Sequence, residues 1–497
     1  MQWDVGLGRA VAHTLLVSGG AALLATVLAV ILSHGIYLAR IPFGRLCAGW
    51  ISSMLLIPVY VQATAWSAGF GIQGWLRLSQ VDAARYPWWG IASAIWIHAV
   101  AALPACFLIL SYGWHRVRDG TFEQAWSELG PGYVATRILP VRLVPWLIGA
   151  FLWTFCVVQN DMVVTNLFQV PTLCESVYQQ VQFGKLRWGP IGTACLIALI
   201  SGLSVALMVS GSQRSTRSVN SISKASWDPV LATRKGATWM VSILVWSIAT
   251  VTVALPWLGM IFRIGIESRM IDGQAVRGWS ANAFLSSLMH VQDYRIEIGW
   301  SCELVFWTCL VSMALALGLI TWIPFRGGSA WVLGTMVFLL ALPGPIVNLS
   351  VSWLFNTAMP PSLQFLGDQT LLGPILALQT RCLPVVYGIL WLARSKFESQ
   401  HEALLSMDQS LPMWLRIWIW LCYARMAILV SALACGMIAF GDLASYLLVQ
   451  PPGVTTVAMR MFELLHYGVR NREASLALLL SAIAVLPSWW LARRVER

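Results

Sequence analysis

Long apolar runs separated by short polar segments extend over the whole chain. A run of roughly 20 apolar residues crosses a bilayer as a helix, because its backbone N–H and C=O groups are then satisfied within the segment. The pattern therefore predicts an all-α polytopic membrane protein with about 11 transmembrane helices. The expected spans are 11–33, 47–70, 89–112, 143–167, 188–211, 237–262, 301–323, 330–356, 371–393, 425–449 and 474–492.

Composition agrees with membrane lipid as the surroundings of most of the chain. Of the 497 residues, 58% are hydrophobic and only 11% are charged, whereas a soluble domain carries about 25% charged residues. The polar segments between the expected spans are too short to form a catalytic domain. The ten cysteines include no C-x-x-C pair and fall mostly within spans. That pattern is typical of small packing residues, so we expect neither a disulfide framework nor a metal site.

The net charge of +11 is distributed unevenly between the two sides of the membrane. If the polar segment 212–236 is cytoplasmic, the loops on its side carry more Lys and Arg than the loops on the other side. Positively charged loops tend to stay inside. We therefore expect a bacterial inner-membrane protein with its N-terminus outside, its C-terminus inside and no nucleic-acid partner. The first run, 11–33, exceeds the apolar core of a usual signal peptide and is expected to remain as a helix.

Two sequence patterns occur twice, in the same order. The stretch IPVYVQATAW around Pro58 resembles GPIVNLSVSW around Pro345, and in each a Trp follows the Pro by eight residues. Later, FCVVQNDMVVTNLFQVPTL resembles GMIAFGDLASYLLVQPPGV. In each of these, Asp161 or Asp442 precedes a Pro by ten residues. Two ordered matches indicate an internal duplication.

The duplication predicts two permease-like halves, 1–211 and 237–497, joined by a basic cytoplasmic linker, 212–236. Corresponding spans run in the same direction, so the repeat is a parallel one. The second half has one extra span at its beginning. Duplicated membrane proteins commonly carry solutes along a path between two related bundles.

Two predicted cytoplasmic segments, 121–140 and 397–420, carry a more specific pattern. They resemble the EAA loop of binding-protein-dependent ABC importer permeases, which reads Glu-Ala-Ala, three residues, Gly, and then a stretch ending in Leu-Pro. The positions on or beside the motif are Glu123, Gln124, Ala125 and Gly130 in the first segment and Glu402, Ala403 and Asp408 in the second. The first segment has Gln where the Glu is expected, and the second has Asp where the Gly is expected and lacks Leu-Pro.

The chain as a whole is similar to the double-length permeases of the ferric-iron and thiamine importer group. The stretch FGDLASYLLVQPPGVTTVAMRMFELLHYG carries much of this likeness. The resemblance implies a type I ABC importer permease fold, two ATPase subunits docked on the EAA loops, and a periplasmic solute-binding protein docked on the outer segments. From the residues alone, an ordinary amphipathic interfacial helix is an equal alternative for each loop.

No ATP site is expected in this chain. The one candidate for the end of a phosphate-binding loop, Gly184-Lys185, has Gln179 in place of the first Gly and Leu186 in place of Ser or Thr. We therefore expect a transport subunit without enzyme activity or cofactor, with ATP and Mg²⁺ used by the partner ATPase.

Three charged residues within the expected spans are candidates for the substrate pathway. A carboxylate in a span is costly unless it faces water or a partner. Asp161 and Asp442 either line the outer half of the path or orient a helix–loop junction through backbone N–H groups, and both interpretations are open. Arg381 either meets an anionic substrate or pairs with a carboxylate such as Glu303, and pairing is the commoner fate of such residues.

By family likeness the expected cargo is ferric iron, with thiamine or another small cation next. A secondary transporter driven by an ion gradient is the alternative class, because it too can contain repeats and membrane carboxylates. Dependence of uptake on ATP separates the two.

Overall fold

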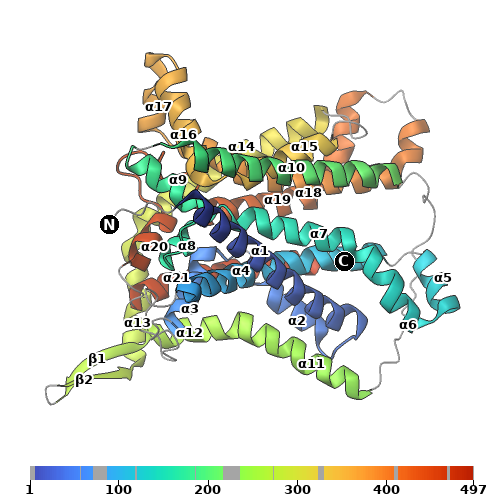
Figure 1. Cartoon of the computed structure of the whole chain (residues 1–497), viewed down its shortest axis with the longest axis horizontal. Helices are drawn as coiled ribbons and strands as arrows, with labels where there is room; N and C mark the ends of the chain where they lie inside the picture. The colour runs from blue at the N-terminus through green and yellow to red at the C-terminus, as the bar shows by residue number, and fades with distance from the viewer. Residues whose placement is uncertain are drawn as a thin grey trace.

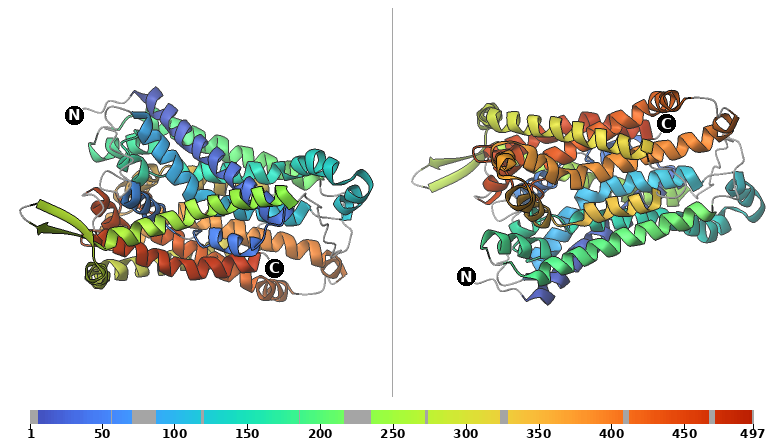
Figure 2. Two further views of the ribbon diagram at one scale, coloured as in Figure 1. Left: turned by 90° about the horizontal axis from the view of Figure 1, so that it is seen from below. Right: turned by 90° about the horizontal axis from the view of Figure 1, so that it is seen from above.

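The computed structural model describes residues 6–55, 57–70, 87–117, 120–184, 186–215, 235–271, 274–322, 329–407, 412–466 and 471–495. The long helices run side by side between two ends of the molecule (Figure 1). One end carries α5 (Gly120–Leu129) and α6 (Pro131–Tyr133), and we call it the α5 end. The other, the hairpin end, carries the antiparallel strands β1 (Ile266–Ile271) and β2 (Gln274–Trp279), which project beyond the bundle (Figure 2).

Most of the described chain is helical. The long helices are α1 (Leu7–Ser33), α4 (Pro87–Val117), α7 (Leu139–Val158), α10 (Trp188–Ser215), α11 (Lys235–Ala249), α14 (Arg295–Trp322), α18 (Leu372–Met407), α19 (Met413–Gly441) and α21 (Asn471–Val495). The shorter ones are α2 (Gly44–Ser52), α3 (Val59–Phe70), α8 (Val163–Leu167), α9 (Leu173–Gln182), α12 (Leu255–Ile264), α13 (Ala281–Met289), α15 (Ser329–Ala341), α16 (Gly344–Trp353), α17 (Phe365–Gln369) and α20 (Val457–His466). Further π- or 3₁₀-helical segments are His34–Leu38, Val134–Ile138, Thr250–Ala254, His290–Tyr294, Leu354–Ala358 and Pro361–Leu363.

The predicted membrane character is confirmed. Over the described residues, nine helical segments are long and apolar enough to cross a membrane, and each overlaps one of the expected spans. A tenth consists of α15 and α16, which pass the same test together but are bent by 98° at the break between them. The all-α prediction agrees with this helical content, and among the described residues the β1–β2 hairpin, between α12 and α13, is a small non-helical addition that the sequence analysis did not predict.

Two expected spans are broken helices instead of continuous ones. The span 47–70 consists of α2 and α3, and α3 begins immediately after Pro58. The span 330–356 breaks after Ala341, and α16 has Pro343 at its N-cap and Pro345 in its first turn. A proline has no backbone N–H, so it is best tolerated in the first turn of a helix and favours a kink or break elsewhere. The continuous spans predicted at these places are therefore wrong in detail.

The helices α7 and α19 end earlier than predicted. The expected spans 143–167 and 425–449 place Asp161 and Asp442 inside the membrane helices, but α7 ends at Val158 and α19 at Gly441. Each aspartate instead accepts the backbone N–H of the residue three positions later, at 2.9 Å for Val164 and 3.2 Å for Ser445. A carboxylate in this position starts a new turn and competes with continuation of the helix.

The same pattern of helix contacts occurs in both parts of the chain. Helices α1, α4 and α7 touch one another, and so do α14, α18 and α19. The last long helix of each part packs against the broken helix of the other. Thus α10 lies along α15, while α21 contacts α2 and α3. Two large hydrophobic cores follow from this arrangement, and the core around α14, α18 and α19 includes Tyr60 and Val61 from α3. The core around α1 and α4 includes Val245 and Ala249 from α11.

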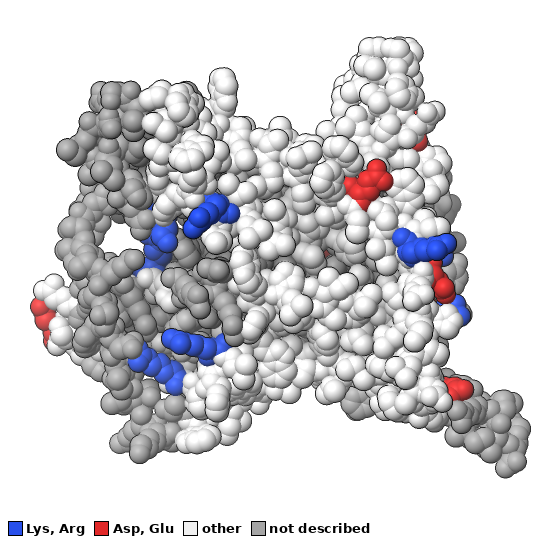
Figure 3. All heavy atoms as spheres, turned by 180° about the vertical axis from the view of Figure 1, so that it is seen from behind, with Lys and Arg blue, Asp and Glu red and all other residues white. Residues whose placement is uncertain are grey.

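Charges separate between the two ends on the face shown in Figure 3. There, most of the visible Lys and Arg side chains lie toward the α5 end, and most Asp and Glu lie toward the hairpin end. The middle of this face carries almost no charge, as expected for a belt in contact with lipid.

The contact between α10 and α15 yields a prediction, because two glycines allow it. A Cβ on Gly202 would lie 2.5 Å from the carbonyl oxygen of Gly334, whereas a Cβ on Gly192 of the same helix meets nothing within 4 Å. Replacing a helical Gly by Ala normally stabilises by about 1 kcal/mol, but overpacking costs about 1–3 kcal/mol. We expect Gly202→Ala to lower the thermal midpoint of the purified protein and Gly192→Ala to keep or raise it. Equal midpoints for the two variants would contradict this close contact between the two helices.

Candidate functional site

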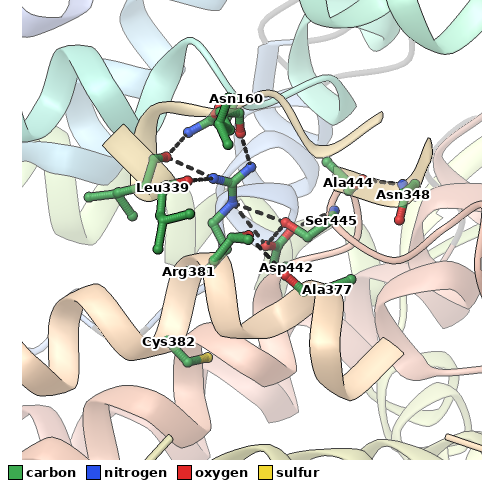
Figure 4. Close-up of polar contacts among 12 residues, drawn as sticks. Asn160, Leu339, Asn348, Ala377, Arg381, Cys382, Asp442, Ala444 and Ser445 are labelled. Carbon is green, nitrogen blue, oxygen red and sulfur yellow. Dashed lines mark hydrogen bonds and ion pairs between the residues drawn. The ribbon is translucent and has the colours of Figure 1, made fainter. Parts of the chain in front are cut away.

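The C-terminal end of α15 lies inside the bundle and exposes carbonyl groups that have no partner in their own helix. The side chain of Arg381, on α18, satisfies several of them (Figure 4). Its Nη1 donates to the carbonyl oxygens of Leu340 at 2.7 Å and Leu339 at 3.3 Å, and its Nη2 donates to that of Leu342 at 2.6 Å. Arg381 is only 6% exposed. A cation at this place also interacts favourably with the negative end of the helix dipole.

Two residues that follow α7 complete the same cap. Gln159 donates from Nε2 to the carbonyl oxygen of Ala341 at 2.8 Å. Asn160 donates from Nδ2 to the carbonyl oxygen of Leu340, and to that of Cys156 at 2.7 Å. Both side chains are buried. The end of α15 is therefore held by donors from both parts of the chain.

Asp442 balances the charge of Arg381. Its Oδ2 lies 3.5 Å from the Arg381 Nε, and Ser445 links the two groups. The Ser445 hydroxyl accepts a hydrogen bond from Nε at 3.0 Å and donates its own hydrogen to the Asp442 carboxylate. Arg381 thus pairs with Asp442 and not with Glu303, which is exposed. Pairing was the favoured prediction, but the partner differs.

Asp161 has a corresponding basic neighbour, His98 on α4. The His98 Nε2 lies 3.1 Å from the Asp161 Oδ2, and its Nδ1 lies 2.7 Å from the carbonyl oxygen of Ala94. A carbonyl only accepts, so Nδ1 carries a hydrogen. The other ring nitrogen, Nε2, faces the carboxylate, so His98 and Asp161 form a buried polar pair between α4 and the segment after α7.

A second polar layer lies toward the hairpin end. Glu175, in the first turn of α9, is buried, and its Oε1 accepts hydrogen bonds from Asn166 at 2.8 Å and Gln179 at 2.9 Å. Its Oε2 is buried without a partner among the described residues. Burial raises the pKa of Glu175, while the bonds from Asn166 and Gln179 and the charge of His466 oppose that rise.

Cys174 lies where the two parts of the chain meet. It packs with Met162 and with Ala444, and its thiol donates to the carbonyl oxygen of Asn160 at 3.2 Å. Burial raises the pKa of the Cys174 thiol well above its usual value, and the nearby acidic groups add to this while Arg381 opposes it. The thiol is therefore neutral, and it packs between the segment that carries Asp161 and the segment that carries Asp442.

The structure thus brings the three predicted pathway residues to one interface, each with close partners. Asp161 and Asp442 are 13% and 15% exposed and both contact backbone N–H groups. These are the contacts that the helix-junction interpretation requires, while a role in the pathway stays a prediction. Over the described residues, no group of three or more His, Cys, Asp and Glu side chains is arranged to hold a metal ion.

The EAA-like segments differ from each other. The first forms α5, whose Phe122 and Trp126 are buried against the ends of α4 and α7 while Gln124 is exposed and Ala125 half-buried. Gly130 ends the helix with a φ of +79°, a conformation that favours glycine. Glu123 lies in α5, but its side chain is outside the described part of the structure.

The second segment begins as a direct continuation of α18. Glu402 and Ala403 lie in the last turns of this helix, which runs to Met407 without a break after the membrane span. Their side chains are outside the described part of the structure, as is Asp408 altogether. A separate short helix like α5 is therefore absent from residues 397–407.

Sequence reasoning missed His98, Gln159, Asn160, Glu175 and His466. A usable signal was present for two of them, because Gln159 and Asn160 precede Asp161 at the end of an apolar run and make three successive polar residues there. His98 is a single polar residue in an apolar run, and its role depends on what α7 places opposite it. No protein-family model matches the chain, and no curated protein is significantly similar to it.

The cap on α15 predicts how substitutions of Arg381 behave. Arg381→Met removes one donor from each of three carbonyl groups, leaves that of Leu342 without a partner among the described residues, and leaves Asp442 charged without its ion-pair partner. Breaking such a buried pair costs about 3–5 kcal/mol, so we expect a large fall in thermal midpoint or in yield of folded protein. The double variant Arg381→Met/Asp442→Asn removes the unpaired charge but not the unpaired carbonyl group of Leu342, and a buried group without its partner costs about 1–3 kcal/mol.

We therefore expect the double variant to recover only part of the lost stability, as measured by thermal unfolding in detergent. Full recovery to the wild-type midpoint would mean that Arg381 serves only to balance Asp442. Asp442→Asn alone is the matched control, since it keeps an acceptor for the Ser445 N–H and leaves the carbonyl cap in place.

Proposed function

We propose that this chain is the fused permease of an ATP-driven ABC importer, with two repeats that surround a solute path. The observation that carries the proposal is the twofold pattern of contacts. Each part has a three-helix group, a helix broken beside proline, and an aspartate that follows a long helix and lies beside a basic residue. The halves 1–211 and 237–497, joined by 212–236, account for this pattern.

A further correspondence supports the repeat at the level of single hydrogen bonds. The hydroxyl of Thr14, on α1, accepts the N–H of Leu173 at the start of α9, at 2.8 Å. The hydroxyl of Ser301, on α14, accepts the N–H of Val457 at the start of α20, also at 2.8 Å. Shared contacts at matching positions are expected of two copies of one unit.

In the proposed mechanism, ATP-driven closure of two partner ATPases moves the halves as rigid bodies. The exposed polar face of α5 supports a docking role, because its buried side anchors it to α4 and α7 and so transmits force. The end of α18 is the proposed second docking element. The basic α5 end supports a cytoplasmic position for both, with the hairpin end outside, where α9 and α20 are proposed to face a solute-binding protein. Ferric iron stays the proposed cargo by family likeness, followed by thiamine or another small cation.

A proton-driven secondary transporter is the second candidate, and the His98–Asp161 pair favours it. A buried pair of a histidine and a carboxylate in direct contact is the type of group that ion-coupled transporters use. The two candidates differ in their energy source. The importer is indicated if cellular uptake of ferric iron stops when ATP is depleted but continues in the presence of an uncoupler. The opposite result indicates ion coupling.

Copurification with the candidate ATPase tests the importer proposal directly. We expect the wild-type permease to retain the ATPase in detergent and the variant Glu402→Ala/Gly130→Pro to lose most of it. Proline cannot adopt the positive φ of Gly130, so the turn after α5 is lost. Gly130→Asn is the matched control, because asparagine tolerates this backbone conformation and should keep the complex. Failure of the wild type to bind any ATPase would refute the proposal.

A further inference from the structure

A side-chain hydrogen bond joins the two parts of the chain at the hairpin end. His466, the last residue of α20, lies with its Nε2 at 2.7 Å from the Oδ1 of Asn166, on α8. The Nδ2 of the same amide donates to Glu175 at 2.8 Å. Asn166 therefore bridges a histidine of the second part to a buried carboxyl group of the first.

The donors and acceptors of this bridge fix its protonation. The His466 Nδ1 lies 2.8 Å from the carbonyl oxygen of Phe462, so it must donate there. Asn166 uses its amide hydrogens toward Glu175 and presents an oxygen to the histidine. The Nε2 must then donate as well, which requires the charged imidazolium. In this arrangement one amide joins a histidine ring that donates from both nitrogens to the carboxyl group of Glu175.

Loss of the proton from His466 removes this bond. A neutral His466 that keeps its bond to Phe462 presents a lone pair to the oxygen of Asn166, and two acceptors repel at this distance. Rotating the Asn166 amide would restore a donor for the histidine, but its oxygen would then face Glu175, which would have to be protonated. With Glu175 ionised, deprotonation of His466 leaves the two parts of the chain without this contact.

We propose that Glu175, Asn166 and His466 form a pH-sensitive latch that holds the hairpin ends of the two halves together when His466 is protonated. Histidine is the side chain that changes charge between about pH 5 and 8. Acidic surroundings keep the latch closed, and a rise in pH opens it. Since the latch regulates the interface between the halves, its role in transport rests on the proposed function, but its opening requires neither ATP nor cargo.

Other charged groups lie on α20 and on the helices that pack against it. Arg460 lies on the same helix and contacts both Glu463, at 3.2 Å, and Glu297 of α14, at 3.4 Å. Helix α21, which also packs against α20, contributes Arg472 and Glu473. The segments α3 and α8 that touch α20 contain no charged residue, and α19, which also touches it, has Arg416 and Arg425 in its first half. On α9, the acidic group that interacts with His466 is Glu175, and the amide of Asn166 lies between the two.

Cys174 provides the measurement, because it is fully buried beside Glu175 and touches the second half through Ala444. Its rate of modification by a small maleimide, followed by peptide-resolved mass spectrometry on the intact permease in nanodiscs, reports separation of the halves. The intrinsic reactivity of the thiol varies with pH, so each rate is divided by that of the His466→Gln variant at the same pH. Glutamine offers an uncharged amide donor near the position of Nε2 at every pH.

We expect this ratio to be near one at pH 5.5 and to rise about tenfold by pH 8.5, a change that corresponds to about 1.4 kcal/mol. Asn166→Ala should label fast at both pH values. The matched control is His290→Gln, since His290 has the same kind of contact with the carbonyl oxygen four residues earlier and no cross-half partner among the described residues.

A ratio that does not change with pH would overturn the latch, and so would an equal effect of His290→Gln. Should Asn166→Ala fail to fold, the His466→Gln comparison decides alone. The labelling experiment uses the permease without an ATPase. A negative labelling result therefore does not refute the importer proposal, and a negative copurification result does not prevent the test of the latch.

Discussion

A helix that ends inside an apolar bundle must find donors for its last carbonyl groups, and the rest of this structure depends on how α15 meets that requirement. A carbonyl group that is buried in apolar surroundings without a hydrogen-bond donor costs free energy. Arg381 supplies most of the donors, but its own charge then needs Asp442. The break at the end of α15 therefore requires the charged Arg381 on α18, and Arg381 in turn requires the opposite charge of Asp442 after α19.

The same requirement ties the two parts of the chain together. Gln159 and Asn160 reach the end of α15 from the far side of the interface, so this helix end is complete only when both parts are in place. The mutual packing of α10 on α15 and of α21 on α2 and α3 has the same effect. Any rigid-body movement of the halves must therefore preserve these contacts or exchange them for others, because the polar groups cannot remain unpaired.

The sequence predicted the elements much better than their partners. Apolar runs located the spans, and Pro58 and Pro345 marked the neighbourhoods of both broken helices, because these signals are local. Arg381 was recognised as a buried charge, yet its partner could not be chosen, since Asp442 is distant in sequence and only the packing of α19 on α18 brings it near. The hairpin was missed although Asp272-Gly273 is a common turn pair, because hydropathy records spans and not strands.

The broken helix α2–α3 has a consequence for how the protein is made. Each piece is too short to cross a bilayer, and α4 covers only part of their surface. Much of the rest is covered by α12 and α21, which come much later in the chain. A ribosome delivers the first part before those helices exist. The segment around Pro58 therefore lacks part of its packing surface until α12 and α21 have been synthesised. Because packing around Pro58 is completed only then, removal of α21 affects a region far from it in sequence.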